Sequence, residues 1–115
     1  MITGTHEIEI EQGGDFDLVL RFDAIDLSGT VATLEIYGQG KDAPTTSIHS
    51  NQVSSDGSVI ITTGTPSRVT SHIKAASTDL YTWGTGGWRL LIDYGDGRRL
   101  AWVRGRVTII PRRGQ

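Results

Sequence analysis

The sequence contains no cysteine, which excludes disulfide bonds, thiolate metal ligands and cysteine nucleophiles. It has only 3 prolines against 15 glycines, a ratio typical of many short strands joined by tight turns. No apolar run approaches the ~18 residues of a membrane-spanning helix, and the N-terminus lacks the basic start and apolar stretch of a signal peptide. We therefore expect a product that is soluble where it is made, without a membrane partner.

Neither sign of charge dominates the chain, because 11 basic and 13 acidic residues leave a formal net charge of -2. This balance gives no overall field toward nucleic acid, so we expect no nucleic-acid partner. The charges are nevertheless uneven: residues 7–17 hold five carboxylates, and residues 98–113 hold six arginines. Two interpretations stay open, namely first and last strands that lie side by side and neutralise each other, or a polarised surface that docks partners.

Seven segments alternate apolar and polar residues and end at turn-forming residues, which is the pattern of half-buried β-strands. The weak fourth segment suits a sheet edge. The expected strands cover residues 8–10, 16–22, 31–37, 45–49, 58–63, 88–94 and 99–110.

One segment breaks this alternation. Thr65 before Pro66, followed by Val69 and Ile73 at a spacing of four, predicts one or two helical turns within residues 65–76. The expected fold is therefore mainly β: an antiparallel Ig-like β-sandwich, or a partly closed barrel, of about seven strands with one short helix. At 115 residues we expect a single domain over residues 1–111 and a short tail over residues 112–115.

Residues with catalytic potential do not form recognisable motifs. The three histidines, His6, His49 and His72, lack metal-ligand spacing, and no Gly-x-Ser-x-Gly elbow is present. The glycine-rich residues 84–87 lack the lysine of a phosphate-binding loop and are interpreted as a flexible turn. We therefore expect no catalytic residue, no cofactor and no metal, and a protein that is not an enzyme.

Aromatic and arginine residues near the C-terminus are the best candidates for a binding surface. Trp88 follows the inward alternation of its strand and is assigned to the core. Trp102 shares the parity of two arginines on the outer face of the last strand, and residues 81–87 are expected to form an exposed loop. Exposed Trp beside Arg is frequent in protein interfaces, although sugar stacking by Trp83 and Trp102 stays an alternative. The predicted contact residues are Tyr81, Trp83, Trp102, Arg104 and Arg106.

Several of these patterns together resemble a known family. Ile-Glu-Gln-Gly-Gly-Asp-Phe at residues 10–16, Ile-Asp-Leu-Ser-Gly at 25–29, Ala-Thr-Leu-Glu-Ile at 32–36 and Trp-Arg-Leu-Leu-Ile-Asp at 88–93 are similar to small structural proteins of tailed bacteriophages and prophages. The order resembles the N-terminal domain of phage baseplate upper proteins and covers nearly the whole chain.

The resemblance implies a non-enzymatic virion protein, assembled in the host cytoplasm. Its expected role is to join neighbouring components of the tail, baseplate or neck as a multi-copy connector, in a ring with other virion proteins. A capsid decoration protein, or a carbohydrate-binding module at the tail tip, would carry similar surfaces and remains an alternative.

Overall fold

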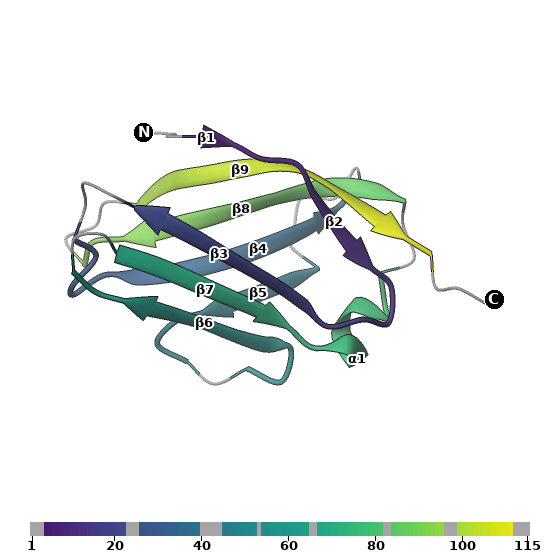
Figure 1. The fold of residues 1–115 in the computed structure, drawn as a ribbon, viewed down its shortest axis with the longest axis horizontal. Coiled ribbons are helices and arrows are strands. Elements are labelled where there is room, and N and C mark those ends of the chain that lie inside the picture. The colour runs from purple at the N-terminus through teal and green to yellow at the C-terminus, as the bar shows by residue number, and fades with distance from the viewer. Residues whose placement is uncertain are drawn as a thin grey trace.

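The computed structural model describes residues 4–22, 26–39, 45–52, 54–64, 67–81, 84–95 and 99–111, without the side chains of residues 4, 5 and 99–102. Two β-sheets lie face to face, and one short helix closes an end of the molecule (Figure 1). The predicted β-sandwich with one short helix is therefore confirmed. Within these described ranges, no helix has the length and apolar character needed to cross a membrane.

The larger sheet has six strands in the order β1-β9-β8-β4-β5, with β2 also paired to β9. The two N-terminal strands run parallel to β9, and all other neighbours are antiparallel. The first and last strands thus lie side by side, as one interpretation of the charge pattern required. The strands are β1 (Gly4–Thr5), β2 (Ile8–Glu11), β4 (Val31–Gly38), β5 (Thr46–His49), β8 (Thr85–Asp93) and β9 (Arg99–Ile110).

The smaller sheet contains β3 (Phe16–Phe22), β7 (Ser67–Ile73) and β6 (Gly57–Thr62), all antiparallel with β7 in the middle. In immunoglobulin nomenclature these are strands B, E and D. They pack against β4, β8 and β9, which correspond to C, F and G, with β5 as the additional C′ strand. The strand order is therefore Ig-like.

The core lies between the sheets and follows the period-two alternation of the sequence. In β4, Ala32, Leu34 and Ile36 are fully buried, and in β8 Leu90 and Ile92 are buried with them. Trp88 is 2% exposed, so its assignment to the core is confirmed.

The helix predicted within residues 65–76 is wrong over most of its length, because β7 occupies residues 67–73 and the helix α1 spans only Ala75–Thr78. Val69 and Ile73 both point inward. A spacing of four is an even number and so fits a strand as well as a helix.

The apolar–polar alternation of β7 is not visible in the sequence, because two serines occupy inward positions that usually hold apolar side chains. Ser67 and Ser71 are buried, whereas the sequence placed them on a helix surface. The Ser67 hydroxyl accepts a 3.0 Å hydrogen bond from the backbone N–H of Leu27 and donates one of 2.7 Å to the carbonyl of Gly64. Ser67 thus anchors the loop before β4.

The helix α1 packs under the corner between β2 and β3. The Thr78 hydroxyl accepts from the N–H of Gly13 at 3.1 Å and donates to the carbonyl of Gly14 at 2.7 Å. Asp15 accepts from the N–H of Ala75 at 2.8 Å, at the start of the helix. These bonds fix the corner to the end of the sandwich (Figure 1).

Candidate functional site

The outer face of the six-stranded sheet carries a cluster of arginines over a glycine-rich floor. The strand register places Gly87 of β8 between Tyr37 of β4 and Arg106 of β9. One cross-strand row away, Arg89 of β8 lies beside Arg104 of β9. We call this surface, made of Tyr37, Arg89, Arg104, Arg106 and the glycines 86, 87 and 105, the arginine face.

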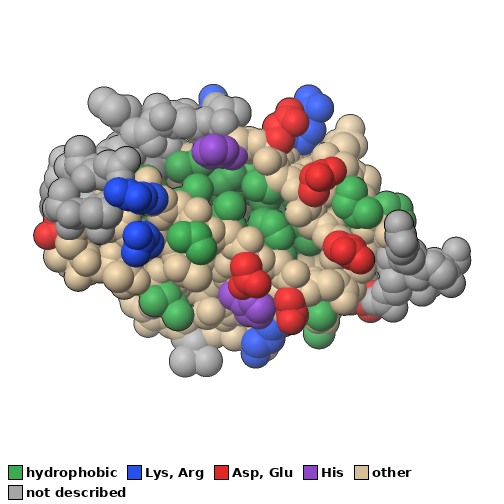
Figure 2. Space-filling model, viewed as in Figure 1, with side chains coloured by type: hydrophobic (Ala, Val, Ile, Leu, Met, Phe, Trp, Pro, Cys, Tyr) green, Lys and Arg blue, Asp and Glu red, His purple; other side chains and the backbone are tan. Residues whose placement is uncertain are grey.

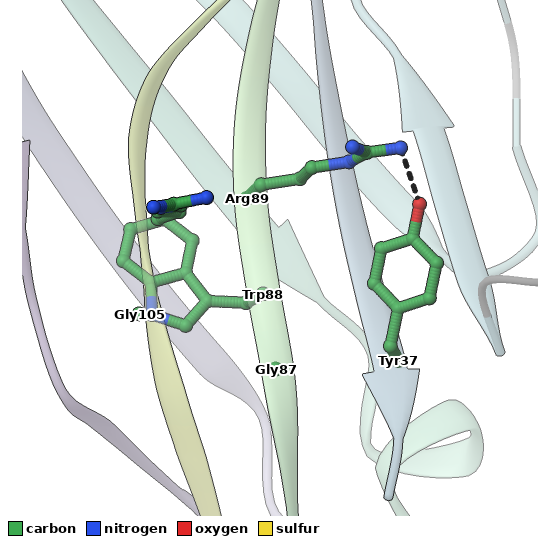
Figure 3. Close-up of a pocket in the computed structure, with 6 residues that line it drawn as sticks. Tyr37, Gly87, Trp88, Arg89 and Gly105 are labelled. Carbon is green, nitrogen blue, oxygen red and sulfur yellow. Dashed lines mark hydrogen bonds between the residues drawn. The ribbon is translucent and has the colours of Figure 1, made fainter. Parts of the chain in front are cut away.

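Arg89 is held in place by two neighbours on β4. Its Nε donates to the Glu35 carboxylate at 2.6 Å, and its Nη2 donates to the Tyr37 hydroxyl at 2.6 Å. The Tyr37 hydroxyl donates in turn to the same Glu35 oxygen at 2.8 Å, and the guanidinium lies 5.2 Å from the Tyr37 ring centroid. The three side chains therefore form a closed network with fixed geometry, of which Figure 3 shows the bond between Arg89 and Tyr37.

The electrostatics of this network agree with its geometry. The hydrogen bond to Glu35 raises the pKa of Arg89 above its ordinary value. Partial burial, followed by the bond to Glu35, raises the pKa of Tyr37. Arg89 thus stays charged but has its countercharge beside it, and Tyr37 stays a neutral hydroxyl.

The floor of the arginine face is low because Gly87, at an outward position between Tyr37 and Arg106, has no side chain. Gly87 and Gly105 line a shallow hollow of about 410 Å³ together with Tyr37 and Arg104. A second hollow continues from it along Gly86 and Arg106. Adjacent strands lie about 4.8 Å apart, so Tyr37 and Arg106 stand about 10 Å from each other across Gly87. An extended segment or a flat side chain fits in this space.

Arg104 and Arg106 give the arginine face its charge. Both are exposed, and within the described part of the chain neither forms an ion pair. Guanidinium groups bind carboxylates through two parallel hydrogen bonds, which a lysine cannot reproduce. The face is therefore suited to a partner with acidic groups.

The inner side of the same strands supports this face. The indole of Trp88 extends away from Arg89 toward Gly105 (Figure 3). Its Nε1 donates a 2.9 Å hydrogen bond to the backbone carbonyl of His6, in the short break between β1 and β2. A Cβ atom on Gly105 would lie 1.6 Å from that same oxygen, so only glycine fits there.

The five predicted contact residues have different outcomes. Arg104 and Arg106 lie together on the arginine face. The third arginine of this face, Arg89, was not among the predicted contact residues. Tyr81 is 1% exposed, and its hydroxyl is hydrogen-bonded to that of Thr46. Its ring fills the core beside α1, so Tyr81 is not a surface contact and its selection was wrong.

The two tryptophans of that set stay predictions. Trp83 lies outside the described residues, and Trp102 has a described backbone in β9 but no described side chain. Val103 pairs with Leu90 and Ala101 with Leu91, so Trp102 has no counterpart on β8. The outer-face assignment assumed unbroken alternation, and the irregularity at Trp102 interrupts it.

Sequence reasoning missed Tyr37, Arg89 and the glycine floor. Tyr37 and Arg89 occupy outward strand positions, and their register across two strands depends on tertiary pairing. Residues 85–87 were interpreted as a flexible turn, whereas they begin β8. The signal available in the sequence was a tyrosine at an outward position of one strand, Tyr37, and two adjacent glycines next to another strand, Gly86 and Gly87.

Across the described residues, no group of three His, Asp or Glu side chains converges on a common point that could hold a metal ion. His49 lines a hollow on this sheet together with Thr33, and its Nδ1 lies at a hydrogen-bond distance of 2.8 Å from the Thr33 hydroxyl. No protein-family model matches the chain, and no curated protein matches it. Its function therefore has to be argued from its own residues.

Proposed function

We propose that the protein is a non-enzymatic structural protein of a tailed-phage virion, a multi-copy connector that joins neighbouring components of the tail, baseplate or neck. The single observation that carries the binding role is the exposed pair Arg104 and Arg106 beside a glycine floor. The resemblance of the turn and core motifs to phage baseplate upper proteins supplies the virion setting.

The neighbour's contact segment is extended and acidic. Gly87 lets a backbone approach the sheet closely between Tyr37 and Arg106, since no side chain stands there on the outer face. Arg104 and Arg106 bind carboxylates of the segment, and the ring of Tyr37 packs against its aliphatic part. Arg89 is already neutralised by Glu35 and serves mainly to hold Tyr37 upright.

Weak contacts suffice in such an assembly. A ring repeats one interface in every copy, and the linked contacts reinforce each other through high effective concentration. The hollow on the arginine face is shallow. This limits its affinity for a small ligand but is compatible with a contact that is repeated in every copy.

The test is incorporation of a charge-reversed chain into particles. We expect the double variant Arg104→Glu, Arg106→Glu to fold but to be absent from purified particles and to lose binding to its neighbours in a pull-down. Lys74→Glu is the control, because this exposed lysine lies at the start of α1, away from the arginine face. Normal incorporation of the double variant would contradict the proposal. Imaging of particles carrying a tagged chain separates tail, baseplate or neck from the capsid surface.

A further inference from the structure

The outer face of the three-stranded sheet has three cross-strand rows with different chemistry. The middle row consists of Val19, Thr70 and Ile60, which the register aligns across β3, β7 and β6. On one side of it lie Asp17 and His72, and on the other lie Arg21 and Arg68. We call this surface, made of those seven residues, the striped face.

The middle row is unusually apolar for a solvent-facing position. Val19 and Ile60 are each 57% exposed, and each lies on an edge strand of this sheet. Single exposed apolar residues are common, but a row of them on edge strands favours association with another surface. The middle row therefore offers two exposed apolar side chains, on either side of Thr70, that a partner can cover.

The flanking rows have opposite polarity. Asp17 is 67% exposed at its side chain and accepts a 2.7 Å hydrogen bond from His72. Arg21 and Arg68 pair in register on the other side of the middle row, and both are exposed. Figure 2 shows this view of the molecule, with basic side chains toward its left, acidic ones toward its right and hydrophobic ones between them.

Such a pattern is complementary to itself under one rotation only. Two copies that face each other are related by a two-fold axis lying in the interface. If the axis runs along the strands, each charged row meets its own kind. If it runs across the strands, through Val19, Thr70 and Ile60, the apolar rows coincide and Asp17 of one copy meets Arg21 of the other. Arg68 then meets the His72 that is bonded to Asp17.

We propose that the chain forms a two-fold symmetric homodimer through the striped face, with β3, β7 and β6 of the two copies antiparallel across the interface. The sheets pack as two layers of a sandwich do, about 10 Å apart and rotated by about 30°. Val19 and Ile60 of each copy cover those of the other, and two Asp17–Arg21 contacts fix the orientation.

The size of the face sets the strength of this dimer. Three strands of six or seven residues offer less than the ~800 Å² per partner of a standard stable interface. The dimer is therefore reversible in solution and becomes persistent where copies are concentrated. It extends the proposed connector, since the arginine face on the opposite sheet stays free for a neighbour.

The experiment is sedimentation velocity at low salt over micromolar to millimolar concentrations of the full chain. We expect wild type to shift from monomer to dimer, and Asp17→Arg and Arg21→Asp each to weaken self-association by about tenfold or more, because like charges then face each other. An equimolar mixture of these two variants restores dimers, since the basic side chain introduced by Asp17→Arg in one copy meets the acidic side chain introduced by Arg21→Asp in the other.

A second pair of variants separates the apolar row from general surface effects. Ile60→Lys is expected to leave a folded monomer, whereas Leu80→Lys keeps wild-type association, because Leu80 is 72% exposed next to α1 and outside the striped face. A wild-type chain that stays monomeric at millimolar concentration, or a mixture that does not restore dimers, overturns the dimer. Neither result bears on the arginine face, whose failure shows in the Arg104 and Arg106 variants instead.

Discussion

Trp88 and His6 are joined by a hydrogen bond between two sheet regions that are 82 residues apart, from the indole Nε1 to the backbone carbonyl at 2.9 Å. The backbone N–H of His6 donates to the carbonyl of Arg104, also at 2.9 Å. Both backbone groups of His6 are therefore hydrogen-bonded in the gap between β1 and β2, where the pairing of the N-terminal strands with β9 is interrupted. This pair of bonds keeps the N-terminal strands aligned along β9.

Replacing Trp88 with Phe is expected to lower the free energy of unfolding by about 1–3 kcal/mol, because the His6 carbonyl loses its donor and the smaller ring leaves a gap. The measurement is urea unfolding, together with hydrogen exchange of the β2 amides, which should become faster. Unchanged stability with unchanged exchange in β2 would show that the indole bond does not anchor the N-terminal strands.

Gly105→Ala should release the N-terminal strands more completely than loss of the indole bond. The new Cβ would lie 1.6 Å from the His6 carbonyl oxygen and 2.5 Å from its carbon, so the backbone has to move away. We expect a loss of about 2 kcal/mol or more. Gly84→Ala is the matched control, since a Cβ there meets nothing within 4 Å and this exposed glycine has an ordinary φ. Equal stability of the two variants would contradict the steric argument.

The sequence predicts the strands well where alternation is unbroken and apolar. The bounds of β3 and β9 agree with the expected ranges to the residue, and β4 extends by one glycine. Prediction failed in β7, because Ser67 and Ser71 are polar residues at inward positions, and Ser67 finds its partners only in the folded chain. The local sequence pattern does not reveal a hydrogen bond that forms only in the tertiary structure.

Of the residues in the candidate site, only the exposed Arg104 and Arg106 could be predicted from the sequence. Arg104 and Arg106 are exposed because they alternate with buried Val103 and Val107, a relation visible in the sequence. The glycine floor and the neutralised Arg89 depend on which strands are neighbours, and that information is absent from a single strand. Tyr81 was misassigned because flanking turn residues suggest a loop, whereas its ring is buried in the core and its hydroxyl is hydrogen-bonded to that of Thr46.

Thr78→Val should destabilise the chain although the two side chains have nearly the same shape. The buried Thr78 hydroxyl bonds the N–H of Gly13 and the carbonyl of Gly14, and valine leaves both groups unpaired at the corner before β3. We expect a loss of about 2 kcal/mol in urea unfolding. The same change at exposed Thr63 serves as the control and should have an effect below about 0.5 kcal/mol. Similar effects at both sites would argue against a structural role of the corner.

Stability should fall at alkaline pH because of Tyr81. Burial raises the pKa of Tyr81 above its ordinary 10.0, so the unfolded chain loses this proton at lower pH than the folded chain does. The stabilisation is fully present below pH 10 and is lost as pH rises toward the folded pKa, with a slope of up to about 1.4 kcal/mol per pH unit.

Tyr81→Phe tests this linkage, because it removes both the ionisable group and the hydrogen bond to Thr46. At neutral pH we expect the variant to be less stable by about 1 kcal/mol. Above pH 10 the free energy of unfolding of wild type should fall more steeply, so that the two urea-unfolding curves approach each other. Tyr37, whose pKa is also raised, is present in both chains and cancels in the difference. A difference that stays constant from pH 7 into the alkaline range would mean that Tyr81 ionises equally in the folded and the unfolded chain.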